Sequence, residues 1–225
     1  MEYVYHYTTI QVLALILDNK TLRFKAAATL NDKKEGSQII KGRNELTFIS
    51  SWSKEEEESL PMWSLYGGLD GVRIGLPIEI FESNLFMKDG PTVVEEYSNG
   101  PLLRTAENLA QGKRAYYHRG VEYHQEQHRS ETIGDDGNDA IWFTKDRYWA
   151  YEKEYRFLFS FPLNTSVRSR VEGDYIDVGI NEELLKEIKV LVGPRNMLAN
   201  KVIAEALLKQ VEAKYEVETS QIPYR

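Results

Sequence analysis

The spacing of apolar residues predicts an α+β protein made of short strands and a few helices. Residues 2–7 alternate between two faces, with three tyrosines on one face and His6 on the other, which is typical of a strand. From Ile10 to Leu17 apolar residues recur every three to four positions, which predicts a helix. Thr8 or Thr9 can cap the first turn of this helix.

The same reasoning predicts elements along the rest of the chain. Further strands are expected at residues 21–25, 46–51, 72–76, 92–97, 115–123, 155–161 and 189–192, with a last one near Val217. Helices are expected at residues 62–67, 77–81, 102–111 and 197–215. Four glutamates at 55–58 predict a solvated loop, and the polar residues 130–139 predict a mobile one. No shift in composition and no internal repeat divides the chain, so we expect a single domain, residues 1–225.

Composition and charge exclude several classes of function. The chain has 225 residues, a formal net charge of −7 and no cysteine, which excludes thiolate catalysis, iron–sulfur clusters and cysteine-based zinc sites. The acidic excess disfavours a broad phosphate-binding surface. The longest aliphatic run, residues 12–17, is too short to span a bilayer, and residues 1–7 lack a leader pattern. We therefore expect a soluble, cytoplasmic protein that does not act in a membrane.

Several common site motifs are missing from the sequence. There is no G-x-x-x-x-G-K-[ST], G-x-S-x-G or G-x-G-x-x-G, which removes the P-loop, serine-hydrolase and Rossmann classes. His124 and His128 have the i, i+4 spacing of a metal site, but no well-placed carboxylate completes a known ligand set. Surface histidines are the better interpretation. Residues 135–139 lack the alternation and the distal glutamate of a calcium loop.

The best candidate site is the segment 149–156, in which two glutamates precede an arginine. If this segment starts a strand, Glu152, Glu154 and Arg156 lie on one face, about 6 to 7 Å from one to the next. Two close carboxylates disfavour each other's ionisation and a guanidinium restores it, so this group is suited to binding a cation or a hydroxyl. The alternative is a solvated strand edge whose charges pair with one another.

The end of the first strand is a second candidate site. His6 can be an ordinary half-buried histidine, because imidazoles on a strand are more often packed than catalytic. Tyr7 and Thr8, however, follow it at the point where the strand ends and a helix begins. A ligand would meet exposed backbone N–H groups there.

Two more places combine a structural and a functional interpretation. Trp63 and Tyr66 have the i, i+3 spacing of neighbours on a helix, which is typical of core packing, yet a flat aromatic wall also stacks on nicotinamide or adenine. Ser51, at the end of an expected strand, can position a ribose or phosphate group. It can equally serve as a strand-end capping residue.

Short motifs follow one another in a specific order along the chain. They are H-Y-T at 6–8, L-N-D at 30–32 with Glu35, F-I-S-S at 48–51, M-W-S-L-Y at 62–66, G-V-R-I-G at 71–75, Lys145, Trp149, Glu152, Glu154, Tyr155, Arg156 and V-G-P at 192–194. This set resembles a large bacterial domain-of-unknown-function family that is often encoded near mobile elements. The resemblance covers nearly the whole chain. One departure is Lys33, which stands where the family has proline after Asn31-Asp32.

The layout is also similar, more distantly, to ADP-ribosyltransferases. In that superfamily an early strand carries His or Arg, a middle strand and helix carry Ser or Tyr, and a late strand carries a catalytic Glu, often as Glu-x-Glu behind a mobile loop. His6, Ser51 or Tyr66, and Glu152-x-Glu154 match this order. The similarity implies two small facing, mainly antiparallel sheets with flanking helices, and NAD as co-substrate.

The resemblance further implies a role for each candidate residue. Glu154 would stabilise the positive charge that develops on ribose as its bond to nicotinamide breaks. Glu152 would orient or activate the acceptor, and Arg156 would tune the carboxylates or bind phosphate. The remaining contacts to NAD are expected from His6 on the adenosine ribose, from Trp63 or Tyr66 on nicotinamide, and from Tyr7, Thr8 and Ser51.

The acceptor and two rival functions stay open at the level of sequence. A protein, a nucleic acid, a small molecule or water could accept ADP-ribose. We further expect a role in phage defence or in a toxin system, and an inhibitory partner protein. A non-catalytic nucleotide, nucleic-acid or protein binding module is one rival, although it has little use for two carboxylates. A magnesium-dependent nuclease-like protein is the other. It needs about three convergent carboxylates, and only Asp32 or Glu35 could join Glu152 and Glu154.

Overall fold

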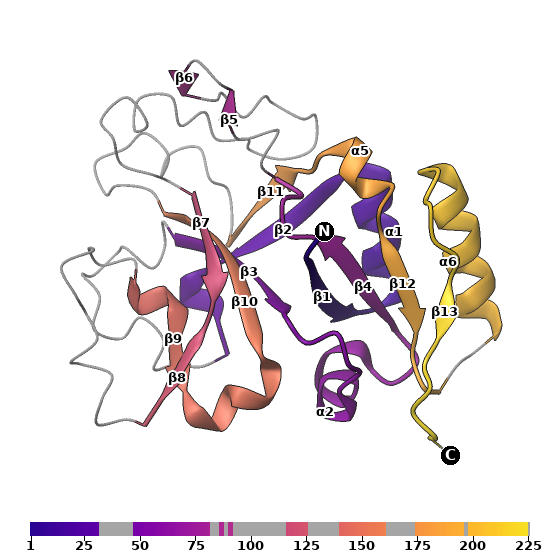
Figure 1. The fold of residues 1–225 in the computed structure, drawn as a ribbon, viewed down its shortest axis with the longest axis horizontal. Coiled ribbons are helices and arrows are strands. Elements are labelled where there is room, and N and C mark those ends of the chain that lie inside the picture. Colours follow the sequence, from indigo (N-terminus) through magenta and orange to yellow (C-terminus); the bar gives the residue numbers. More distant parts are fainter. Residues whose placement is uncertain are drawn as a thin grey trace. The chain divides into compact units, whose positions relative to one another are not determined.

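The computed structural model describes residues 1–31, 47–81, 86–87, 90–91, 116–125, 140–160, 174–195 and 198–224. The fold is mixed α and β, with a large, mostly antiparallel sheet and few helices, which confirms the predicted mixture (Figure 1). Several predicted features lie outside the described residues: the strand at 92–97, the helix at 102–111, the loop at 130–139, Asp32, Glu35 and His128. No helix among the described residues is both long and apolar enough to cross a membrane.

The chain divides into two compact units. Unit 1 comprises residues 1–22, 52–84 and 179–225, and unit 2 comprises residues 23–51 and 85–178. Strand β3 (Thr47–Ser53) contributes its last two residues to unit 1 and the others to unit 2. The single domain expected from the sequence stays a prediction.

Unit 1 is built on a sheet with β1 (Tyr3–Thr8) at its centre. One edge of β1 pairs with the end of β3, where Tyr5 lies opposite Ser53, and the other pairs with β4 (Val72–Pro77). Beyond β4 the order continues with β12 (Lys189–Val192) and β13 (Glu218–Thr219). All these pairs are antiparallel except β12 with β13, which are parallel.

Two helices pack beside this sheet and against each other (Figure 1). Helix α1 (Ile10–Asn19) begins at Thr9, whose side chain accepts a hydrogen bond from the N–H of Val12, as predicted. Helix α6 (Leu198–Gln210) contacts α1 and β12. The predicted end of α6 at residue 215 is wrong, because Glu212 adopts a left-handed conformation with φ 54° that a helix cannot continue through.

Short helical turns complete unit 1. The predicted helix at 62–67 is α2 (Leu60–Met62) followed by a π-helical turn, η3 (Trp63–Gly67), and glycine closes it as expected. The helix predicted at 77–81 is wrong, because residues 78–81 form a turn in which Ile80 N–H bonds to the carbonyl of Pro77. Helix α5 (Glu182–Leu185) was not predicted; Asn181 caps it.

Unit 2 contains the strands that carry the acidic segment. Strand β2 (Thr21–Ala26) lies between β3 and β11 (Tyr175–Gly179), and β10 (Glu154–Ser160) pairs with both β3 and β7 (Tyr116–Gly120). The predicted strand at 115–123 is interrupted at Val121, so that β8 (Glu122–His124) is separate and pairs in parallel with β9 (Thr144–Asp146). The other elements are η1 (Ala27–Thr29), β5 (Phe86–Met87), β6 (Gly90–Pro91), η5 (Ala140–Phe143) and η6 (Arg147–Glu152).

The core of unit 2 lies beside the strand that carries the candidate carboxylates. Phe24 and Phe159 make an edge-to-face contact, with ring centroids 5.1 Å apart. One buried apolar cluster consists of Ala27, Ile49, Trp142, Phe143 and Leu158. Strand β10 is therefore buried on both faces, because Leu158 and Phe157 point to opposite sides and both are fully buried.

Candidate functional site

The acidic segment adopts a helical turn followed by a strand, and this shape brings its two glutamates together. Asp146 caps the 3-10 helix η6 by accepting a hydrogen bond from Tyr148 N–H. Glu152 ends this helix, and Lys153 then adopts a left-handed conformation with φ 46°. Strand β10 begins at Glu154. The expectation that Glu152 belongs to the strand is therefore wrong, and the two carboxylates converge through the turn at Lys153.

The ammonium group of Lys145 bridges the two carboxylates. Its Nζ lies 2.7 Å from Oε2 of Glu152 and 3.3 Å from Oε2 of Glu154. The guanidinium of Arg156 binds Glu154 with two hydrogen bonds, Nε to Oε1 at 2.8 Å and Nη2 to Oε2 at 2.9 Å. Arg156 Nη1 also donates to the carbonyl oxygen of Trp142. We call Lys145, Glu152, Glu154 and Arg156 the buried charge cluster.

All four side chains of the buried charge cluster are withdrawn from solvent. None of these residues is more than 5% exposed. The alternative interpretation is therefore wrong about solvent exposure, whereas the mutual pairing of charges that it expected is confirmed. Ions are buried in a protein only when partners and hydrogen bonds replace the water they lose, and two cations here face two carboxylates. Removing one member would leave the others with uncompensated charge.

Glu154 is held in its ionised form. Burial alone would raise the pKa of this carboxyl, but the charge and hydrogen bonds of Arg156, the charge of Lys145 and a hydrogen bond from Ser51 together lower the pKa to about 2. The N–H of Glu154 donates to the hydroxyl oxygen of Tyr123 at 2.8 Å. Burial raises the pKa of Tyr123 to about 12, so its phenol is neutral at pH 7. Glu154 is thus a carboxylate anion at every physiological pH.

The low pKa of Glu154 predicts a loss of stability in acid. Its carboxyl titrates near pH 2 in the folded chain and near the ordinary value of 4.5 when unfolded, so below pH 4.5 protons favour the unfolded state. The free energy of unfolding should fall between about pH 4.5 and pH 2. Urea unfolding of the wild type and of Glu154→Gln at pH 7, 4 and 3 measures this. The difference in free energy of unfolding between the wild type and Glu154→Gln should shrink in acid. A difference that stays constant with pH would contradict the low pKa of Glu154.

Unit 2 brings together only part of the predicted site. Ser51, Glu152, Glu154 and Arg156 meet in the buried charge cluster, as described above. Lys145 was noted in the sequence without a role. No sequence signal identified its role, because the burial of Lys145 between Thr144 and Asp146 of β9 is seen only in the structure.

Unit 1 holds the remaining predicted residues. The imidazole of His6 is half-buried and lies 5.1 Å from the ring of Trp52. Tyr7 is buried, its hydroxyl accepts a hydrogen bond from Ser59 N–H, and its ring meets Trp63 edge to face at 4.9 Å. Thr8 is buried as well.

Trp63 and Tyr66 differ in their surroundings. Trp63 is fully buried and donates from Nε1 to Glu58 at 3.0 Å, so the core-packing interpretation describes it. Tyr66 is exposed. The two rings therefore do not form one exposed wall, and stacking of a ligand on Tyr66 stays a prediction.

The two described histidines of unit 2 each lie close to a polar side chain of the protein. Nδ1 of His118 lies 2.7 Å from the hydroxyl of Tyr155, and Nε2 of His124 lies 3.4 Å from a carboxylate oxygen of Glu122. Within the described ranges, no group of three or more His, Asp or Glu side chains is placed to hold a metal ion.

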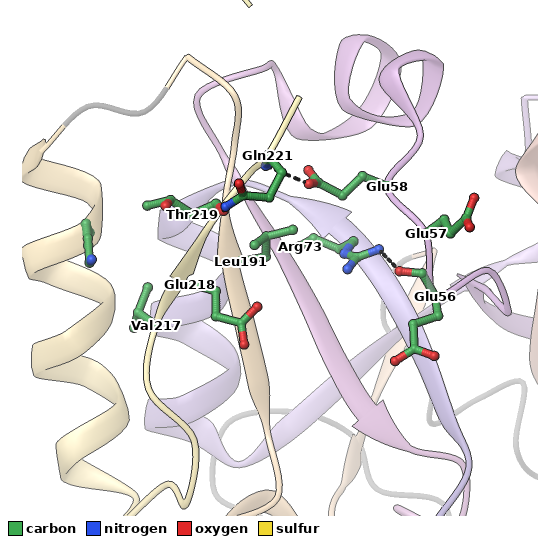
Figure 2. Close-up of a pocket in the computed structure, with 10 residues that line it drawn as sticks. Glu56, Glu57, Glu58, Arg73, Leu191, Val217, Glu218, Thr219 and Gln221 are labelled. Carbon is green, nitrogen blue, oxygen red and sulfur yellow. Dashed lines mark hydrogen bonds between the residues drawn. The ribbon is translucent and has the colours of Figure 1, made fainter. Parts of the chain in front are cut away.

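Unit 1 also contains a pocket of about 520 Å³ that the sequence did not predict (Figure 2). Arg73 lies at its centre, where Nη1 donates to the carbonyl of Glu56 at 2.7 Å and the guanidinium covers the ring of Tyr5. Glu58 accepts hydrogen bonds from Trp63 Nε1 and from Gln221 N–H. The expected solvated loop is confirmed in part: Glu56 and Glu57 are exposed, Glu55 and Glu58 are half-buried, and residues 56–58 form one wall of the pocket. The lining residues are Glu56, Glu57, Glu58, Arg73, Leu191, Lys201, Val217, Glu218, Thr219 and Gln221.

Comparison with known families locates one match on this chain. Residues 62–157, which include η3, β4 and the buried charge cluster, match the model of a family described as Protein of unknown function (DUF2971). Comparison with curated proteins and with solved structures finds no match. The expected resemblance to an uncharacterised domain-of-unknown-function family is therefore confirmed for residues 62–157, whereas the rest of the chain, which the resemblance was also expected to cover, lies outside the match.

Proposed function

We propose that this protein is an NAD-dependent enzyme of the ADP-ribosyltransferase type. The proposal includes two facing, mainly antiparallel sheets and transfer of ADP-ribose to an acceptor or to water. The observation that supports it is the ionised state of Glu154, whose pKa is about 2 despite its burial. A carboxylate that must stabilise a developing cation has to be charged before the reaction starts, and a site of low dielectric strengthens its effect.

The reaction divides into bond cleavage and capture. The bond between ribose C1′ and the nicotinamide nitrogen breaks, nicotinamide leaves with the electron pair as a neutral molecule, and C1′ becomes cationic. Glu154 stabilises this charge electrostatically. Glu152 orients the acceptor, whose nucleophilic atom bonds to C1′ and releases a proton to solvent. Arg156 holds the carboxylate of Glu154 in place through its two hydrogen bonds.

The other expected contacts to NAD belong to the same proposal. They are His6 on the adenosine ribose, Tyr66 on nicotinamide, and Tyr7, Thr8, Ser51 and Trp63 as supporting residues. NAD cleavage would suit a phage-defence or toxin system, and such a system would call for an inhibitory partner protein.

A second candidate function is a non-catalytic binding module for a nucleotide, nucleic acid or protein. The burial of the charge cluster favours it, because Glu152 and Glu154 are at most 5% exposed and are already paired with Lys145 and Arg156. In this candidate the cluster stabilises unit 2 and touches no ligand.

Nicotinamide release by the purified wild type tests the proposal. NAD is incubated with the protein, with and without a cell extract as a source of acceptors, and nicotinamide is measured by chromatography. We expect nicotinamide to accumulate together with an equal amount of ADP-ribose, free or attached to an acceptor. A carbocyclic NAD analogue, in which the ribose bond cannot be cleaved, is the control: it should raise the melting temperature without releasing nicotinamide.

Two outcomes contradict the proposal in different ways. Thermal stabilisation by NAD without nicotinamide release, even in cell extract, supports the binding module. The lack of both effects removes NAD as the ligand.

A further inference from the structure

Strand register places two side chains of opposite charge in the pocket of unit 1. Arg73 on β4 lies opposite Leu191 on β12, and Leu191 lies opposite Glu218 on β13. Residues directly opposite each other on neighbouring strands project from the same face of a sheet. Arg73, Leu191 and Glu218 therefore form a row across this face, and all three line the pocket of about 520 Å³ (Figure 2).

The guanidinium of Arg73 is held in place but is not neutralised. Its Nη1 donates to the carbonyl oxygen of Glu56 at 2.7 Å, and its Cζ lies 4.6 Å from the ring centroid of Tyr5. Although four glutamates line the pocket, Arg73 forms no ion pair within 4.0 Å with any carboxylate of the described residues. Its Nε, which is buried, and its Nη2 have no acceptor among these residues either. A buried donor without an acceptor is rare in proteins and points to an acceptor from outside the chain.

Two other arginines of this chain show what binds to that edge of a guanidinium. Arg23 holds the carboxylate of Asp177 with Nε and Nη2, each at 2.8 Å, and Arg156 holds Glu154 with the same two nitrogens. The two parallel bonds match the two oxygens of a carboxylate. The corresponding edge of Arg73 therefore suits the carboxylate of a ligand.

The opposite side of the pocket suits a positive charge. Glu58 already accepts two hydrogen bonds from the chain, and Glu56 is hydrogen-bonded to the hydroxyl of Tyr5. The side chain of Glu218 is exposed, and its carboxylate makes no hydrogen bond or ion pair with the described residues. An ammonium group is the natural partner of such a carboxylate.

We propose that this pocket binds an amino acid as its zwitterion, with the ligand's carboxylate on Arg73 and its ammonium group on Glu218. An ion of one sign is disfavoured, because Glu218 repels an anion and Arg73 repels a cation. Two strand spacings set the Cα atoms of Arg73 and Glu218 about 10 Å apart, so a small molecule fits between their charged groups. Leu191 and Val217 line the pocket as well and can contact the carbon skeleton. The volume of about 520 Å³ is typical of small-molecule sites.

This binding function goes beyond the proposed NAD chemistry and uses none of its residues, so its test needs no NAD. Isothermal titration calorimetry of the wild type is carried out with each common L-amino acid. Glycine, β-alanine and 4-aminobutyrate, whose two charges are progressively farther apart, define the spacing. We expect at least one of these zwitterions to bind with a dissociation constant of about 1 mM or lower.

Blocked forms of the best ligand test the two charges separately. The N-acetyl derivative lacks the ammonium group, the amide lacks the carboxylate, and each should bind about tenfold or more weakly than the free amino acid. Glu218→Gln should weaken binding of the free amino acid by a similar factor, and so should Arg73→Lys, which keeps the charge but loses the two parallel bonds.

Glu57→Gln is the matched control, because it removes the same charge from the same pocket. The side chain of Glu57 points away from Arg73 in Figure 2, so this variant should change the dissociation constant by less than about twofold. Glu218→Gln should bind the N-acetyl derivative as well as the wild type does, since neither partner of that ion pair is then needed. Glu218 is exposed, so its variant should fold, and thermal melting checks each protein.

Three outcomes overturn the proposal. One is a wild type that binds no zwitterion at about 10 mM. Another is a blocked derivative that binds as tightly as the free amino acid. The third is an equal loss of affinity in Glu57→Gln and Glu218→Gln, which would mean that only the overall charge of the pocket matters.

Discussion

Glu154→Gln should lower the rate of nicotinamide release from NAD by at least about a hundredfold. The substitution keeps the size of the side chain but removes the negative charge that stabilises the ribose cation. Losses of a hundred- to a thousandfold are typical when one group that stabilises transition-state charge is removed. The measurement is nicotinamide release by purified protein at saturating NAD, with circular dichroism confirming that the variant is folded.

The matched control is Glu152→Gln, at the same cluster and with nearly the same burial. Both variants leave Lys145 with a weaker partner, so both should lose several kcal/mol of folding free energy. Only Glu154→Gln should lose cleavage; Glu152→Gln should keep nicotinamide release within about tenfold, because it acts on the acceptor.

Glu154→Asp keeps the charge but withdraws the carboxylate by one methylene group. It should fold better than Glu154→Gln and still lose most of the activity, because electrostatic stabilisation of the cation depends on position. If folded Glu154→Gln releases nicotinamide at the wild-type rate, Glu154 is not the catalytic residue and the cluster is structural.

Gly71→Ala should lower the free energy of unfolding by more than about 4 kcal/mol, beyond the usual range of point substitutions. A Cβ at this position would lie 2.1 Å from the carbonyl oxygen of Gly67 and 2.2 Å from that of Thr8. Both obstacles are backbone atoms, so no side chain can rotate to make room. Gly193 N–H also bonds to the carbonyl of Gly71, so a shift there would disturb the end of β12.

Gly120→Ala is the control for this prediction. A Cβ on Gly120, the last residue of β7, would meet no atom within 4 Å. It should change the free energy of unfolding by less than about 0.5 kcal/mol. Urea unfolding, monitored by tryptophan fluorescence, measures the free energy of unfolding of both variants. If the free energy of unfolding of Gly71→Ala lies within about 1 kcal/mol of the wild-type value, the backbone around Gly71 is loosely packed and the prediction is wrong.

The acidic segment illustrates how far the sequence predicts the candidate site. Side chains alternate between the two faces of a strand, and this alternation correctly placed Glu154 and Arg156 on one face, where they form two hydrogen bonds. The same period failed for Glu152, because the chain turns through a left-handed residue at Lys153 that carries no glycine or asparagine signal. Lys145 could not be assigned a role from its position, since its partners come seven and nine residues later across a turn.

By itself, the sequence determined the local elements whose patterns are strong: β1, α1, β4 and β12 agree with their predicted ranges to within one or two residues, and the cap of α1 is one of the two threonines predicted. Periodicity and capping act within a few residues, so they can be read from the chain alone. Only the tertiary structure decided which charges are buried, that Trp63 lies in the core, and that Arg73 and Glu218 line one pocket. Burial depends on what distant segments cover, and a residue's pKa depends on that burial; neither is written in local spacing.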